Sequence, residues 1–403
     1  MASGAGRSSP VEFIVLIALI ISLVALAIDA MLPALPLIAA DLGVQRVNDS
    51  QYVISLFFAG MALGQMFFGP LSDSVGRRPA IISGFALFAL GCLLSIFAVN
   101  YEQMLLGRLL QGIGAAGPRI VSIALVRDQF KGREMARVMS FVMTVFILVP
   151  VFAPALGQLV LIVADWRFIF VMFLLLVLIL VLWFWIRQPE TLAQQQRVPF
   201  SFTQLTLDIV AIYQIRSSLG YTLAMGFIFG GFIGYLSSSQ QIFQVQYQLH
   251  ELFPVYFGIL ACAIGFASLC NAGLVMRFGM RRLSSYAMSG ICLLSVPFLL
   301  LAEMQDGHPP LYQLMAYLLP LFFCFGILFG NLNALAMEPL GHIAGLGSAL
   351  VGSVSTLMSV VFGVIVANAY DQTVIPLVVG FAVLGLAGLM TMRWTEAGQV
   401  TAD

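Results

Sequence analysis

Charge is what this sequence lacks most. Only 9% of its 403 residues are Asp, Glu, Lys or Arg, whereas soluble domains average about 25%. Hydrophobic residues make up 61% of the chain, and the mean hydropathy is +1.02. This composition excludes an ordinary soluble domain and indicates a membrane protein. The length leaves room for about twelve spans of ~20 residues with short connectors.

Residues that carry catalysis or bind metals are also scarce. The three histidines lie near the ends of apolar runs, and the five cysteines lie inside such runs without metal-type spacing, as is typical of buried thiols. We find no nucleophile–base pair, phosphate loop or metal cluster, and the net charge of zero indicates no nucleic-acid partner. The sequence therefore predicts neither an enzyme nor a metal site. The three histidines are His250, His308 and His342, and the five cysteines are Cys92, Cys262, Cys270, Cys292 and Cys324.

Apolar runs bounded by charge, glycine or proline predict an all-α membrane protein with twelve transmembrane helices. The first run continues to about residue 40, too long for the apolar region of a signal peptide, so we expect an uncleaved span. A polar linker, 188–218, separates two six-helix bundles, 1–187 and 219–403. The predicted helices cover 13–39, 51–71, 79–99, 103–125, 135–163, 166–187, 219–243, 252–276, 283–302, 311–337, 343–369 and 373–393.

The linker itself leaves two alternatives open. Leu205, Ile209, Ile212 and Tyr213 recur at helical spacing, which is typical of a segment lying along the membrane surface. A solvated linker explains the polar composition equally well.

The distribution of lysine and arginine predicts the orientation. If both termini are cytoplasmic, fourteen of the eighteen basic residues fall on the cytoplasmic side and only Arg46 and Arg167 in outer loops. Cytoplasmic loops of membrane proteins carry such an excess, so we expect both termini inside. The cytoplasmic residues are Arg7, Arg77, Arg78, Arg127, Lys131, Arg133, Arg137, Arg187, Arg197, Arg216, Arg277, Arg281, Arg282 and Arg393.

A charged, glycine-containing turn occurs once in each half. The first copy, Gly69–Pro79 (GPLSDSVGRRP), follows the second predicted span, and the second, Gly273–Arg282 (GLVMRFGMRR), follows the eighth. Their arginine pairs are offset by about half the chain, which indicates parallel repeats, a known transporter plan with the substrate bound between them. The second copy has Arg277 where the first has Asp73.

Three charges lie inside predicted spans, where each costs at least ~2.5–3.5 kcal/mol and therefore needs a reason. Asp29 lies in the first helix, and Arg108 and Arg119 share one face of the fourth because they are eleven residues apart. Gly112 lies between the two arginines and leaves space for a neighbour or a ligand. Asp29 and Arg108 are expected at similar depth, so they could form either a static salt bridge or a switchable proton site. Arg119 could bind an anionic group of a substrate or pair with a nearby acid.

Several of these segments together resemble one family. Gly69–Pro79 is similar to the loop signature of the major facilitator superfamily, and Arg108–Ala116 (RLLQGIGAA) to its fourth-helix motif. Ala27–Pro36 (AIDAMLPALP) resembles the first-helix motif of drug:proton antiporters, and Pro150–Gly157 (PVFAPALG) the fifth-helix motif of exporters. Together they look like the Bcr/CflA (bicyclomycin/chloramphenicol resistance) branch. The fifth-helix motif departs from the family at three usual glycines, which are Val149, Ala153 and Gln158 here.

The resemblance implies a function and a set of site residues. It implies a proton-coupled antiporter in the bacterial inner membrane that exports small amphipathic compounds by alternating access, as a monomer, with the proton gradient rather than a cofactor as driving force. Its partners are then the substrate, protons and the lipid bilayer. The implied residues are Asp29 and Arg108 for proton coupling; Gly69, Asp73, Gly76, Arg77, Arg78 and Asp128 for a conformational switch; and Pro150, Pro154 and Gly157 for the antiporter motif.

The resemblance also predicts which polar residues line the substrate cavity, if helices 1, 4, 7 and 10 form it. Amides and hydroxyls on an apolar wall suit neutral or amphipathic compounds. The alternative function is a narrow-specificity proton-coupled transporter of a metabolite such as an amino acid or sugar. A non-transporting receptor would not need Asp29 or the duplicated halves. The cavity candidates are Arg119, Gln111, Tyr235, Gln240, Gln241, Asn331 and Asn333.

Overall fold

The computed structural model describes residues 10–397, apart from 200, 202–205, 207–209 and 211. In this part of the chain all regular structure is helical, and twelve helices are long and apolar enough to cross a membrane. The predicted all-α fold with twelve spans is therefore confirmed. The chain divides into two compact units, Met1–Val44 with Leu56–Phe202, and Gln45–Ser55 with Thr203–Asp403. The division falls inside the linker predicted at 188–218, and each unit is described by itself.

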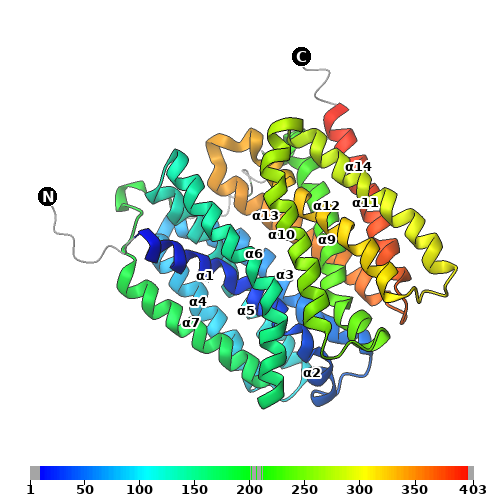
Figure 1. Cartoon of the computed structure of the whole chain (residues 1–403). Helices are drawn as coiled ribbons and strands as arrows, with labels where there is room; N and C mark the ends of the chain where they lie inside the picture. Colours follow the sequence, from blue (N-terminus) through cyan, green and yellow to red (C-terminus); the bar gives the residue numbers. More distant parts are fainter. Residues whose placement is uncertain (1–9, 200, 202–205, 207–209, 211, 398–403) are drawn as a thin grey trace. The chain divides into compact units, whose positions relative to one another are not determined.

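The first unit is a bundle of long helices in which α4 and α5 run side by side (Figure 1). Its first span is not one helix but two, joined by a short 3-10 turn, whereas the sequence predicted a continuous helix over 13–39. The elements are α1 (Pro10–Asp29), η1 (Leu32–Ala34), α2 (Leu35–Asp41), α3 (Tyr52–Val75), α4 (Arg77–Ile96), α5 (Tyr101–Gln129), α6 (Gly132–Val163), α7 (Arg167–Arg187) and η3 (Gln194–Gln196).

The second unit contains the remaining six spans and also Gln45–Ser55, which comprises the segment before α3 and the first four residues of α3. In this unit α9 packs against α12, α13 and α14. The span that begins with α9 ends in a π-helix, a rare form that frequently occurs at functional sites. The elements are η2 (Val47–Gln51), α9 (Arg216–Gln240), the π-helix η4 (Gln241–Gln246), α10 (Phe253–Phe278), α11 (Met280–Glu303), α12 (Leu311–Met337), η5 (Glu338–Ile343), α13 (Ala344–Asn368) and α14 (Ile375–Ala397).

The two copies of the charged turn have the same local structure. Gly76 separates α3 from α4 with φ of +110°, and Gly279 separates α10 from α11 with φ of +76°. Glycine reaches these angles without a steric penalty, so each turn can reverse the chain between two antiparallel spans. The repeat seen in the sequence is thus a repeat of backbone geometry.

Close helix contacts in the first unit depend on small residues of α5. A Cβ added to Gly112 would lie 2.0 Å from the Phe57 carbonyl oxygen of α3, and one added to Gly114 would lie 2.3 Å from the Phe88 amide nitrogen of α4. The space predicted beside Arg108 is therefore filled by neighbouring backbone and not by a ligand. This is the packing that small residues permit between membrane helices.

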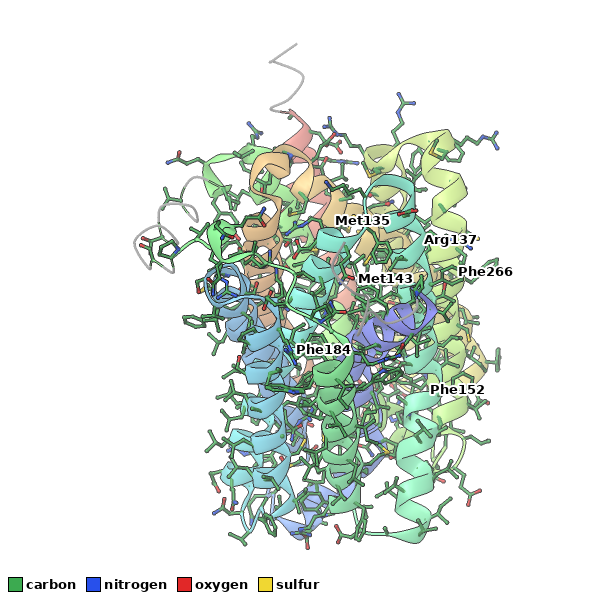
Figure 2. All side chains as sticks on the ribbon, turned by 90° about the vertical axis from the view of Figure 1, so that its left-hand side faces the viewer. Met135, Arg137, Met143, Phe152, Phe184 and Phe266 are labelled. Atoms are coloured by element: carbon green, nitrogen blue, oxygen red, sulfur yellow. The ribbon has the colours of Figure 1, made fainter. Side chains whose placement is uncertain are left out.

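The outer faces of the spans carry apolar side chains (Figure 2). In the first unit Phe152 of α6 is 60% exposed, and in the second unit Phe266 of α10 is 62% exposed. Such exposure on long apolar helices is expected where lipid replaces water as the solvent.

The end of the linker packs on the second unit. Ile212 is fully buried, and the Tyr213 hydroxyl donates to the Leu350 carbonyl oxygen of α13 at 3.2 Å. Burial raises the pKa of Tyr213. The solvated-linker alternative is therefore wrong at Ile212. The other two residues of the predicted pattern, 205 and 209, lie outside the described residues.

Candidate functional site

The first helix is interrupted at Asp29. α1 ends there, and the next turn is 3-10, with the Met31 N–H donating to the Ile28 carbonyl oxygen. Pro33 follows, and because proline has no N–H it cannot bond the Asp29 carbonyl oxygen as a continuing helix would. The Asp29 side chain is buried, with 5% of the residue exposed. A buried acid thus lies at a break in a membrane helix, the arrangement found at ion and substrate sites of transporters.

Arg108 of α5 bonds to the same stretch of α1. Its Nη2 donates to the Ala27 carbonyl oxygen at 3.1 Å, which is free because the Met31 N–H has turned to Ile28. Its Nη1 donates to Gln111 Oε1 at 2.5 Å, and its guanidinium lies 4.5 Å from the centre of the Phe57 ring. Arg108 is completely buried. The break in α1 therefore provides the acceptor that holds the arginine.

The contact predicted between Asp29 and Arg108 is not formed in this structure. Within the described part of the chain, no hydrogen bond or ion pair involves the Asp29 carboxylate. Arg108 is held instead by neutral acceptors, and Gln111 passes the network on by donating to Ser95 Oγ at 3.1 Å. Gln111 is fully buried in this network and does not line an open cavity. The static salt bridge, one of the two alternatives left open by the sequence, is thus absent here.

The fifth-helix motif packs against the break. A Cβ added to Gly157 of α6 would lie 1.8 Å from the Ala30 carbonyl oxygen, so only glycine fits there. Pro150 and Pro154 both lie inside α6, and Pro154 leaves the Pro150 carbonyl without its helical partner. Two of the replaced motif positions, Val149 and Ala153, line a cavity of about 230 Å³ between α1, α6 and α7. The motif therefore positions α6 against the residue that follows Asp29.

Arg119 differs from Arg108 in both exposure and partners. It is only half-buried, and among the described residues its one side-chain hydrogen bond runs from Nη1 to Met61 Sδ, at 3.6 Å. No ion pair involves it in this part of the chain. The nearby acid that the sequence left as an alternative is not found.

The polar residues predicted on the seventh span are buried in the second unit. The Tyr235 ring packs edge-on against Phe322, with ring centres 4.7 Å apart, and the residue is 1% exposed. Gln240 donates to Gln244 Oε1 at 3.0 Å. Gln240 thus uses its amide group inside the unit.

The two asparagines predicted on the tenth span point in different directions. Asn331 is buried and forms a reciprocal pair with Asn271 of α10, at 2.9 and 3.0 Å. Asn333, two residues later, is exposed. Because residues two apart lie on different faces of a helix, the two side chains cannot line the same wall.

Arg77 is the centre of a charged cluster at the junction of α3 and α4. Its Nη1 lies 2.5 Å from Asp73 Oδ1, and its Nε lies 3.1 Å from Asp128 Oδ2 at the end of α5. It also donates to Ser72 Oγ at 2.8 Å, and Ser72 in turn donates to the Gly69 carbonyl oxygen at 2.8 Å. Arg77 therefore pairs with both acids of the implied conformational switch, Asp73 and Asp128, and is itself 5% exposed.

Arg78 takes a different position from its neighbour. Its guanidinium lies 4.5 Å from the centre of the Trp185 ring of α7, and Nη2 donates to the Trp185 carbonyl oxygen at 2.6 Å. It fixes the end of α7 and does not bond the two acids.

Sequence reasoning missed Glu190, which joins this cluster from the linker. Its carboxylate accepts the backbone N–H groups of Arg77 and Arg78 at 2.9 and 3.0 Å, so it caps the N-terminus of α4. The following Thr191 donates to Asp128 Oδ2 at 3.1 Å. An acid next to proline after the sixth span was the available signal, but only packing shows what it caps.

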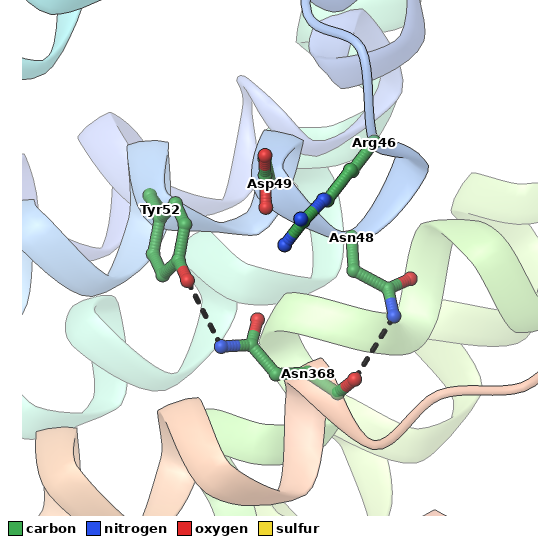
Figure 3. Close-up of a pocket in the computed structure, with 5 residues that line it drawn as sticks. All are labelled: Arg46, Asn48, Asp49, Tyr52 and Asn368. Atoms are coloured by element: carbon green, nitrogen blue, oxygen red, sulfur yellow. Dashed lines mark hydrogen bonds between the residues drawn. The ribbon is translucent and has the colours of Figure 1, made fainter.

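A second polar cluster lies in the second unit around Asn48, and of its members the sequence analysis named only Gln241, which it expected to line the substrate cavity and which is buried in the cluster. Asn48 Nδ2 donates to the Asn368 carbonyl oxygen at 3.0 Å, and Asn368 Nδ2 donates to the Tyr52 hydroxyl at 3.0 Å (Figure 3). Asn48 Nδ2 also donates to the Tyr370 carbonyl oxygen at 2.9 Å. Gln51 Nε2 donates to Gln241 Oε1 at 2.5 Å. We call these residues the amide cluster. Beside it lies a cavity of about 320 Å³, lined by Arg46, Asn48, Asp49, Tyr52 and Asn368.

Tyr370 completes the amide cluster. Its hydroxyl donates to the Gln241 carbonyl oxygen at 3.3 Å, at the start of the π-helix. Burial and the neighbouring charge of Asp371 raise the pKa of Tyr370 to about 12. The phenol therefore stays a neutral donor, and the cluster is held by uncharged groups.

No group of three or more His, Cys, Asp or Glu side chains that could hold a metal ion occurs in the residues that the structure describes.

Comparisons with known proteins agree with this architecture. Residues 17–363 match the family model described as Major Facilitator Superfamily. The uncharacterized MFS-type transporter YdgK of Bacillus subtilis is 30% identical over 355 residues, covering 87% of each chain. The bicyclomycin resistance protein homolog of Haemophilus influenzae is 28% identical over 376 residues, covering 92% of each. The multidrug resistance protein MdtL of Vibrio parahaemolyticus is 28% identical over 374 residues, covering 90% of each.

A solved structure shows the same fold. The human organic anion transporter MFSD10 (TETRAN) matches with a TM-score of 0.70, covering 96% of this chain and 100% of that one, at 18% sequence identity.

Proposed function

Since this chain belongs to the major facilitator superfamily, we propose that it is a proton-coupled antiporter that exports small amphipathic compounds by alternating access. The chain is a transporter rather than an enzyme, and its twelve spans make it a multi-pass membrane protein. Relatives named for bicyclomycin and multidrug resistance support the drug:proton antiporter branch that the motifs resemble. The bacterial inner membrane, with both termini inside, is the location that these relatives and the arginine distribution support.

The observation that carries the proposal is the environment of Asp29. This carboxyl group is buried at a helix break in the described structure and has no hydrogen bond or ion pair there. An unpaired charge at that depth is costly, and binding a proton removes it. A group that can exchange between a neutral buried form and a charged form is what a proton carrier requires.

Arg108 supplies the partner for the charged form. It bonds the Ala27 carbonyl oxygen, two residues before Asp29, so its guanidinium is held beside the break. We propose that proton loss from Asp29 draws Arg108 away from this neutral acceptor and onto the carboxylate. Such an exchange would close the break around α1, and Gly157 would transmit the change to α6 because the two backbones are in contact.

Alternating access also needs a barrier on each side of the membrane. The amide cluster of the second unit includes Tyr52 at the start of α3, and the charged cluster of the first unit includes Arg77, which follows the end of α3. We propose that these two clusters are the barriers, the charged one on the cytoplasmic side. The charged cluster is held by ion pairs and the amide cluster by neutral amides, so salt would weaken only the charged cluster.

Proton release from inverted vesicles tests the proposal. Chloramphenicol, a cationic dye and the anionic 2-naphthoate are each added to vesicles that contain the unchanged protein, Asp29→Asn or, as a control, Asp165→Asn, a half-exposed acid in the loop before α7. We expect substrate-dependent proton release that is lost in Asp29→Asn and kept in the control. Release that survives in Asp29→Asn would refute Asp29 as the carrier. No response to any of these compounds would favour the narrow metabolite transporter.

A further inference from the structure

The spans contain more buried positive than negative charge. In the described spans, only Asp29, Arg108 and Arg119 are charged and lie more than five residues from both span ends. All three belong to the first unit, and the spans of the second unit have no charge at this depth. Even with Asp29 ionised, the described spans contain two positively charged guanidinium groups and only one carboxylate at this depth. Within the described spans, one buried cation therefore has no counter-charge at this depth.

The contacts identify Arg119 as that cation. Arg108 is completely buried and held by a carbonyl oxygen and an amide oxygen, so it is both satisfied and inaccessible. Arg119 is half-buried, and its side-chain partner in the described structure is the Met61 sulfur, at 3.6 Å. A thioether is a weak acceptor, whereas a guanidinium has five N–H donors. Most of its hydrogen-bonding capacity is unused.

A second polar group without a partner lies on the same helix. Ser122 is fully buried, and its Oγ has no hydrogen bond within the described part of the chain. Residues three apart are neighbours on a helix surface, so this hydroxyl lies within one turn of Arg119. Arg119 itself lies ten residues before the end of α5, about 15 Å along the helix axis from that end.

We propose that Arg119 is the subsite for an anionic group of the transported compound. A guanidinium binds carboxylates and sulfonates through parallel hydrogen bonds, so amphipathic compounds with such a group would be preferred over neutral analogues of the same shape. The substrate would then supply the counter-charge that the spans lack. This inference rests on the proposed transport function, and it names the class of substrate.

Binding of three matched probes tests the proposal without requiring transport. 2-Naphthoate, 2-naphthamide and 2-naphthylmethylammonium differ mainly in charge, and their affinities are measured calorimetrically for the purified protein in lipid nanodiscs. We expect the naphthoate to bind at least about tenfold more tightly than the amide, the scale of one charge-assisted hydrogen bond. Arg119→Gln should abolish this preference while leaving the amide affinity unchanged, and Arg119→Lys should keep part of it. Arg127→Gln, an exposed arginine on the same helix, is the control and should change neither.

The proposal is overturned if the unchanged protein shows no preference for naphthoate over the amide, or binds none of the three probes. It is also overturned if the preference persists in Arg119→Gln. The unchanged protein and Arg119→Lys decide the question if the Gln variant fails to fold. A naphthoate preference together with no proton release would contradict the antiport mechanism and leave the subsite standing. Proton release without a naphthoate preference would support the antiport mechanism and refute the anion subsite at Arg119.

Discussion

Replacing Gly157 by alanine should separate α6 from the break in α1. The new Cβ would lie 1.8 Å from the Ala30 carbonyl oxygen and 2.8 Å from its carbon, and these are backbone atoms that no side-chain rotation can move. Reaching an ordinary contact of about 3.5 Å requires a shift of roughly 1.7 Å. Forcing one extra methyl into a packed interior costs about 1–3 kcal/mol. For a unit of this size each kcal/mol lowers the Tm by about 2–4 °C, so we expect a decrease of about 2–12 °C.

Tryptophan fluorescence during heating of the purified protein measures this effect. Three of the four tryptophans, at 166, 183 and 185, belong to the first unit, so the signal reports mainly on the unit that is changed. Gly273→Ala is the matched control, because it is also a helix-interior glycine but its Cβ would have no atom within 4 Å. Its Tm should stay the same or rise. If Gly157→Ala unfolds at the temperature of Gly273→Ala, the close contact between α6 and Ala30 does not exist as described.

Two further predictions concern the polar clusters. Arg77→Ala should lower the free energy of unfolding by about 1–3 kcal/mol, because it leaves two acids without their cation in a partly buried site. Arg281→Ala removes a single ion pair that is about half exposed, so it should cost only ~0–1 kcal/mol. Equal losses of the two variants in thermal unfolding would contradict this ranking. Asn48→Ala removes three hydrogen bonds of the amide cluster, so Ser55→Cys, at a position that is 1% exposed and one helical turn after Gln51, should react with an impermeant maleimide at least about fivefold faster in that background, corresponding to ~1 kcal/mol. An unchanged labelling rate would show that the amides do not hold this end closed.

The sequence by itself was sufficient to predict the twelve spans and the family. Apolar runs of span length and the excess of arginine at one set of turns act locally, so they can be counted along the chain. The same holds for the ion pair between Asp73 and Arg77, because only four residues separate the two charges. Motif spacing also identified Asp29, Arg108 and Gly157 as residues of interest.

The arrangement of these residues depends on tertiary packing. Pro33 and Pro36 were visible signals of the break in α1, but the acceptor of Arg108 is a backbone carbonyl that becomes available only because the next turn is 3-10. Asn48 bonds a residue 320 positions away, a separation at which no local pattern operates. Every residue has a backbone carbonyl group, so the residue type of the acceptor does not reveal such a hydrogen bond in the sequence. For this reason the spans could be predicted from composition and periodicity, whereas the partners of their buried polar groups were decided by how the helices pack.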